Sequence, residues 1–541
     1  MQTDNKMGTA SINKLILTMS LPPLFSMFLQ YSYNLIDSAF VAQLSENALT
    51  AVSLSFPLTT IMNATSIWIG VGINVLIAGS LGKKEQMKAN SIASTGLLLS
   101  FMLGLILNLA VLATSRIYFQ AFTSNDEIFS LCIEYMRICA FIQIPNMVHI
   151  AIQKMLQAAG NMIAPMWFQI AGVIVNIVFD PLLIFGIGPF PKLGISGAAI
   201  ATVMGYALSM VLALFLLFNG KQAVQIESRM IRFDFRIIKN IFVCGFPSFI
   251  MNALSAFTVT FANLFLVAYS DTAIAFFGAY YKIKQLVEMT VNGLIQGCLP
   301  IMRFNYGAGK QARVKSAFRY GTAYASIMML LGTLVLAIMP TQLLSLFAAS
   351  ESMQEFGKNA MCIMSVGYLF CGFTTMIATY FQATDKVIES NILQLMRQLV
   401  VLLPAMWVLN HTMHISGIWI SFPVTELISF GAAIILLMIY NRKSKNKQSS
   451  WVIHAFSSVV PTSDCSVQYQ LRQLFGRRGI SLNSYLNSIP TVKGNFSGIL
   501  LIICKELAVV LADCINYYII NEEKIPYYKL FWKTILKFKS E

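Results

Sequence analysis

The chain has 541 residues, of which 57% are hydrophobic and only 11% are charged, and its mean hydropathy is +0.68. Soluble domains carry about 25% charged residues, so this composition excludes an ordinary soluble protein. The formal net charge is +15 at pH 7. In so apolar a chain we assign this charge to contact with anionic membrane lipid, and we expect no nucleic-acid partner.

Up to Tyr440 the chain consists almost entirely of apolar stretches of about 20–30 residues, which are long enough to cross a bilayer as helices. A membrane β-barrel would instead show alternating segments of about ten residues. We therefore predict an all-α polytopic membrane protein with twelve transmembrane helices. Their expected ranges are 14–40, 49–81, 89–114, 128–158, 163–186, 193–218, 237–268, 273–300, 315–340, 356–383, 387–410 and 415–440.

A polar segment divides these helices into two sets of six. Short motifs recur about one half-chain apart, as in Ile195-Ser196-Gly197 and Ile415-Ser416-Gly417. Because an even number of spans returns the chain to its starting side, the halves are expected to be parallel repeats. The predicted units are an N-terminal lobe at 1–218, a cytoplasmic linker at 219–236, a C-terminal lobe at 237–440 and a basic extension at 441–541.

The distribution of Lys and Arg predicts the orientation of the chain in the membrane. With the N-terminus inside, the inner segments before the extension carry 17 of these residues, Lys154 and Arg303 among them, and the outer loops carry three. The positive-inside rule then places both termini in the cytoplasm of a plasma-membrane protein. The extension has no counterpart in the repeat, and we assign it no role; a functional tail, a fusion and a translational artefact all remain open. The nine cysteines are scattered, so neither disulfides nor a structural metal are expected.

Ionisable residues inside the spans are the candidates for function, because a charge at a helix centre costs roughly 2.5–3.5 kcal/mol. Asp37 lies in the first helix, and Asn176 and Asp180 are one turn apart in the fifth. If the two carboxylates meet, they suit Na⁺ binding through oxygen or proton exchange. Alternatively, Asp37 caps an interfacial turn and Asp180 ends a helix before Pro181.

The second half holds its own candidates for a substrate or coupling site, which are Glu288, Glu426 and Arg397. Lys282 and Lys284 are expected to extend toward the membrane surface. The segment 305–311 lacks the first glycine and the Ser or Thr of a phosphate loop, so we expect no ATP and no cofactor other than Na⁺ or H⁺. We expect a transporter driven by an ion gradient and not an enzyme.

Several longer segments are characteristic when taken together. They are Ser20-Leu21-Pro22, Asn34-Leu35-Ile36-Asp37-Ser38, Gly70-Val71-Gly72-Ile73-Asn74, Leu156-Gln157-Ala158-Ala159-Gly160-Asn161, residues 180–186, residues 193–202, Phe304-Asn305-Tyr306-Gly307-Ala308 and Pro423-Val424-Thr425-Glu426. At these residues the sequence resembles the multidrug and toxic compound extrusion (MATE) family, over about residues 10–440.

The resemblance implies two six-helix lobes around a central cavity, and export of cationic or amphipathic compounds in exchange for Na⁺ or H⁺. It also implies a cation-coupling site at Asp37, Asn176 and Asp180, to which Tyr135 and Thr202 carry over. The chain is expected to act as a monomer. Two alternatives remain, a flippase for lipid-linked saccharides and a membrane sensor that no longer transports.

Overall fold

The computed structural model describes residues 6–123, 125–219, 222–226, 233–345 and 351–443, and these residues contain helices but no strand. Residues 220–221 and 227–232 of the linker and nearly all of the extension at 441–541 lie outside the described residues. The first lobe consists of α1 (Lys6–Thr9), α2 (Ile12–Ala42), α3 (Glu46–Gly82), α4 (Gln86–Phe122), α5 (Asp126–Ala140), α6 (Gln143–Ala158), α7 (Ile163–Phe185) and α8 (Ile195–Asn219).

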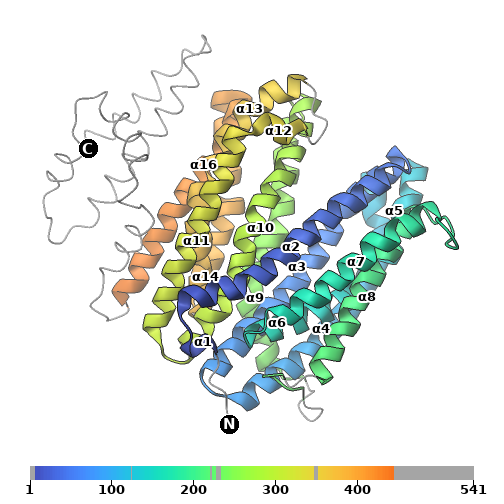
Figure 1. Cartoon of the computed structure of the whole chain (residues 1–541). Coiled ribbons are helices and arrows are strands. Elements are labelled where there is room, and N and C mark those ends of the chain that lie inside the picture. The colour runs from blue at the N-terminus through green and yellow to red at the C-terminus, as the bar shows by residue number, and fades with distance from the viewer. Residues whose placement is uncertain (1–5, 124, 220–221, 227–232, 346–350, 444–541) are drawn as a thin grey trace, which may run out of the picture. The chain divides into compact units, whose positions relative to one another are not determined.

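The second lobe repeats this arrangement (Figure 1). It consists of α9 (Phe235–Leu266), α10 (Asp271–Gly307), α11 (Gln311–Ile338), α12 (Pro340–Ser345), α13 (Glu351–Ser365), α14 (Tyr368–Ala383), α15 (Val387–Leu395), the π-helix η2 (Met396–Val400) and α16 (Leu402–Lys443).

The predicted fold of twelve spans in two lobes is confirmed. Eight described helices are long and apolar enough to cross a membrane, and the pairs α5–α6 and α13–α14, bent by 42° and 41°, make two more. The stretch Val387–Tyr440 contains two spans, because His414 breaks the helix with φ 51° and ψ −139°. The charged helix α10 completes the set.

Several predicted boundaries were too narrow. The span expected at 273–300 extends through Gly307, and the one expected at 89–114 covers Gln86–Phe122. Hydropathy detects only the apolar part of a helix, whereas backbone hydrogen bonding continues into the polar interface. The short helices α1 and α12 were not predicted at all.

The two lobes meet at the end of the molecule that carries α1 and diverge toward the opposite end (Figure 1). At the meeting end α3 packs directly on the first turns of α9. A Cβ placed on Gly72 would lie 2.1 Å from the Ile241 carbonyl oxygen, and one on Gly245 would lie 2.0 Å from that of Trp68. These two glycines therefore let the two backbones approach closely.

Polar side chains also join the lobes at this end. On α10, the Arg303 guanidinium donates to the carbonyl oxygens of Val75 in α3 (3.1 Å) and Ala383 in α14 (3.2 Å). It also forms an ion pair with Asp385. Arg303 and Lys154 were both counted among the cytoplasmic basic residues, yet they are only 6% and 7% exposed, so the bias that sets the predicted orientation rests on the others.

The short helix α1 is attached to the second lobe by hydrogen bonds to its backbone carbonyls. Asn305 donates to the oxygen of Met7 over 2.9 Å, and Lys310 donates to that of Gly8 over 2.9 Å. Arg313 donates to the oxygen of Ala10 over 2.6 Å. The beginning of the first lobe is thereby fixed beneath α10 and α11.

Because α3 and α9 touch through backbone, a methyl group at Gly245 should separate them. We expect Gly245→Ala to destabilise the protein by about 1–3 kcal/mol, as overpacking does. The measurement is the melting temperature of the detergent-purified protein. The control is Gly278→Ala in α10, where an added Cβ meets no atom within 4 Å. Equal melting temperatures for the two variants would contradict the close approach.

Candidate functional site

The first lobe carries a polar face on α2. Gln30, Tyr33 and Asp37 follow one another at helical spacings of three and four residues, so they share one face of the helix. α2 packs along α7 on this side. One carboxylate oxygen of Asp37 is buried and has no hydrogen-bond partner among the described residues. The helix thus presents a bare acceptor to the interior of the lobe.

Asn176 and Asp180 form the opposite wall on α7. They are 3% and 1% exposed, respectively. In the amide orientation that satisfies its neighbours, Asn176 donates to Asp180 Oδ2 over 3.1 Å and accepts from the backbone N–H of Thr202 over 3.3 Å. Pro181 follows immediately and cannot donate a backbone hydrogen bond, so one helical hydrogen bond is missing beside the carboxylate although α7 continues to Phe185.

The predicted coupling residues come together in space. The carboxylates of Asp37 and Asp180 are close enough to repel each other, and Asp37 also interacts electrostatically with Tyr135 of α5. Thr202 of α8 is joined to Asn176. Four helices therefore deliver two carboxylates, an amide and two hydroxyls to one place.

This arrangement suits a hard cation or a proton. Oxygen atoms of carboxylates, amides and hydroxyls are the ligands that such ions prefer. The unpartnered oxygen of Asp37 fits the role of a ligand, because a buried acceptor without a donor is costly. A positive charge placed between two carboxylates would also remove their mutual repulsion.

A cavity with about 390 Å³ of empty space, part of it open to solvent, lies beside this group. Gln30, Tyr206 and His149 line it and were not among the predicted site residues. The helical spacing of Gln30 and Tyr33 from Asp37 is a sequence signal that could have identified Gln30. The full set of residues that line the cavity is Ser26, Gln30, Tyr33, His149, Gln169, Gly172, Val173, Asn176, Thr202, Gly205, Tyr206 and Ser209.

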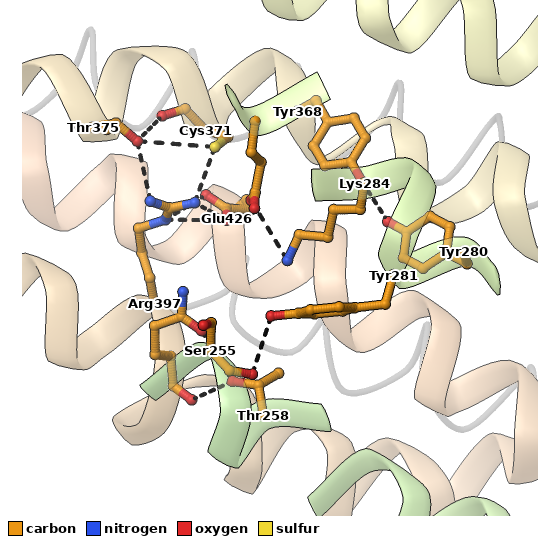
Figure 2. A network of polar contacts seen from close by, with 12 residues as sticks. Ser255, Thr258, Tyr280, Tyr281, Lys284, Tyr368, Cys371, Thr375, Arg397 and Glu426 are labelled. Atoms are coloured by element: carbon orange, nitrogen blue, oxygen red, sulfur yellow. Dashed lines mark hydrogen bonds and ion pairs between the residues drawn. The ribbon is translucent and has the colours of Figure 1, made fainter. Parts of the chain in front are cut away.

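The second lobe holds a network of opposite charges (Figure 2). Arg397, which lies in the π-helix η2, is 7% exposed and contacts Glu426 of α16 at 2.7 Å. It also donates to Thr375 Oγ1 over 3.0 Å and Cys371 Sγ over 2.9 Å. The guanidinium is thus held on several sides by partners from two neighbouring helices.

The same network continues along α10. Lys284 pairs with Glu288 at 3.5 Å and lies over the ring of Tyr281. The hydroxyls of Tyr280 and Tyr368 are 2.8 Å apart. The expectation that Lys284 extends to the membrane surface was therefore wrong, because a carboxylate one turn away holds its ammonium inside the lobe.

The two lobes therefore differ in their charge balance. In the second lobe Glu288 and Glu426, both predicted candidates, each have a basic partner. In the first lobe, no Lys or Arg among the described residues forms an ion pair with Asp37 or Asp180. Only the first lobe thus keeps two intramembrane acids without a basic partner among the residues described.

Two six-span lobes with polar groups buried inside each define a membrane transporter rather than an enzyme. The chain belongs to the MatE family, whose model matches residues 22–182 and 247–408, one segment in each lobe. This confirms the resemblance drawn from the sequence motifs.

Curated relatives cover most of the chain. It is 27% identical over 426 residues to a protein of Shewanella oneidensis named FAD transporter, a match that covers 78% of this chain and 93% of the relative. It is 24% identical over 432 residues to the multidrug export protein MepA of Staphylococcus aureus, covering 79% and 94% respectively.

Solved structures share the fold. A structure described as the outward-facing conformation of a multidrug resistance MATE family transporter matches with a TM-score of 0.78, at 23% identity. A transporter from Pyrococcus furiosus, described as having a binding pocket of reverse polarity, also matches with a TM-score of 0.78, at 24% identity. Each match covers 82% of this chain and 100% of the other.

The buried pair of the second lobe should contribute to stability only as a pair. We expect Glu426→Gln to destabilise the protein by about 3–5 kcal/mol, because it leaves the Arg397 guanidinium buried and uncompensated. Thermal unfolding of purified protein is the measurement. The double variant Arg397→Met/Glu426→Leu should recover most of the loss.

The matched control is Glu85→Gln, which breaks the exposed pair with Lys88. Exposed pairs contribute at most about 1 kcal/mol, so this variant should melt close to wild type. If Glu426→Gln is no less stable than Glu85→Gln, the Arg397–Glu426 contact is not the buried pair described above.

Proposed function

We propose that the protein is a secondary active exporter that moves cationic or amphipathic small molecules out of the cell in exchange for Na⁺ or H⁺. The observation that carries this proposal is the convergence of Asp37 and Asp180 inside one lobe with no basic partner among the described residues. Two carboxylates held this way release energy when a cation or proton arrives.

The position of Asp37 suggests how ion binding is coupled to the shape of the transporter. A cation shared by Asp37 and Asp180 draws α2 toward α7. Nearer its N-terminal end, α2 packs against α10 of the other lobe, where Ser20 donates to the Leu294 carbonyl oxygen over 3.3 Å. Ion binding thus biases the contact between the lobes, and substrate and ion need only act on the same two-state equilibrium.

The relatives support export of small molecules and suggest two classes of cargo. MepA is named for multidrug export, which favours cationic and amphipathic compounds. The Shewanella relative is named for FAD, which favours an anionic flavin as the second candidate. Tyr31 interacts electrostatically with Tyr281 of the other lobe, and tyrosine rings suit planar aromatic molecules of either class.

We place the protein in the plasma membrane as a monomer, with both termini in the cytoplasm. The excess of Lys and Arg on the inner segments supports this orientation. It puts the end where the lobes meet on the cytoplasmic side, so the described arrangement faces outward.

The proposal is tested with vesicles of known orientation that contain the purified protein and the cationic dye rhodamine 123. Under an imposed Na⁺ or H⁺ gradient, wild type should expel the dye, and the gradient that works identifies the coupling ion. Asp37→Asn should abolish the gradient-driven part, because it removes one of the two carboxylates while keeping the size of the side chain.

The control is Asp126→Asn at the exposed start of α5, which should transport like wild type. If Asp37→Asn transports as well as this control, the site in the first lobe is not the coupling site and Glu288 and Glu426 become the candidates. If wild type moves no dye under either gradient, export of cationic compounds is refuted.

A further inference from the structure

A lysine is buried where the two lobes join, and the proposed coupling mechanism does not use it. Lys154 of α6 is 7% exposed. Its ammonium donates to Gln157 Oε1 over 3.0 Å and to Gln296 Oε1 of α10 over 2.8 Å. Gln157 Nε2 donates to the same Gln296 oxygen over 3.1 Å. The cluster therefore connects the first lobe to the second.

This cluster has more donors than acceptors. An ammonium has three N–H donors, and the structure shows two acceptors for them, the amide oxygens of Gln157 and Gln296. The Gln296 oxygen also accepts from Gln157 Nε2. No carboxylate among the described residues forms an ion pair with Lys154. In this it differs from Arg303, Lys284 and Arg397, which all have an acidic partner. A charge removed from water without a counter-charge is costly, so this position favours an added anion.

The surroundings hold the lysine in place. A Cβ on Gly70 of α3 would lie 3.0 Å from Lys154 Cγ, so the glycine lets the lysine stem lie close to α3. Asn74 donates to the Lys154 carbonyl oxygen over 2.9 Å and fixes the backbone. Gln296 remains partly exposed, so one side of the cluster is not sealed by protein.

The position along α10 relates this cluster to the residues that we associate with cargo. Gln296 lies about two turns before Arg303 on α10, farther from the end where the lobes meet. Glu288, which interacts with Tyr31 across the lobes, lies eight residues earlier. Eight residues span about 12 Å of helix, which is the length of a small aromatic molecule. The basic cluster and the acidic group thus lie about one small molecule apart along the same helix.

We propose that Lys154, Gln157 and Gln296 form an anion-binding subsite that takes a carboxylate or phosphate group of a transported amphipathic molecule. The anion accepts the third ammonium donor in a charge-assisted hydrogen bond, and the amide N–H groups of the glutamines reorient toward it. The aromatic body of the same molecule then extends toward Tyr31 and Glu288. This inference rests on the proposed function and adds a chemical class of substrate to it.

The test uses two dyes that differ only in one group. Rhodamine 110 carries a free carboxylate, and rhodamine 123 is its methyl ester. Binding of each dye to the purified full-length protein is followed by fluorescence anisotropy. We expect Lys154→Gln to weaken the binding of rhodamine 110 by about tenfold or more, because one charged hydrogen bond is lost. The affinity for rhodamine 123 should stay within about twofold of wild type. Lys154→Arg should retain most of the preference for the acid.

The matched control is Lys282→Gln, which removes an equal charge from an exposed position of α10 and should change the affinity for neither dye. Equal losses for both dyes in Lys154→Gln would mean that the lysine only supports the structure, and would overturn the proposal. An unchanged affinity for rhodamine 110 would do the same.

A second measurement needs no variant and separates phosphate from carboxylate. On wild type, flavin mononucleotide should displace rhodamine 110 about tenfold more effectively than riboflavin, which lacks the phosphate. Equal displacement would exclude phosphate as a ligand and limit the subsite to carboxylates; it would overturn the subsite if the two dyes also bind equally. Failure of the export proposal appears separately, as absence of gradient-driven rhodamine 123 efflux, and leaves these binding ratios unaffected.

Discussion

The cost of placing charge in an apolar medium governs the interior of this protein. A buried ionisable group is stabilised by an ion pair, by a hydrogen-bond network or by a bound ion. The second lobe uses the first solution, with Arg397 held by Glu426 and Lys284 by Glu288. The first lobe instead holds Asp37 and Asp180 with no basic partner among the described residues, and in the proposed function a mobile cation or a proton supplies the missing charge.

Glycine plays a complementary part, because charges can act across the lobes only where helices come close. Gly72 and Gly245 bring α3 and α9 into backbone contact, and Gly70 makes room for Lys154. The meeting end therefore combines small residues and directional hydrogen bonds with aromatic packing, because the Trp68 ring of α3 lies against Phe242, Phe246 and Phe249 of α9. The contacts of such an interface are either made or lost, which suits the two-state equilibrium in the proposed function.

Much of this could be predicted from the sequence. The apolar runs predicted the spans, and the one-turn spacing of Asn176 and Asp180 indicated a shared face. The pairing of Arg397 with Glu426 could not be derived, because hydropathy does not report which faces of separate helices meet. Lys154 was placed with the cytoplasmic charges because it lies near the end of a span, whereas α3 of its own lobe and Gln296 of the other lobe lie against it and it is buried. Contacts between lobes depend on packing that a single chain pattern does not contain.

The attachment of α1 has a consequence for how the protein can change during evolution. Asn305, Lys310 and Arg313 recognise carbonyl oxygens, which every residue possesses, so these bonds do not constrain the exposed side chains of Lys6 and Thr9. Selection should act instead on the three donors, on the buried Met7 and on Gly8, where a Cβ would lie 3.1 Å from the ring of Phe304. Among homologues, the exposed positions of this short helix should therefore vary in sequence while its anchoring positions in the other lobe stay constant.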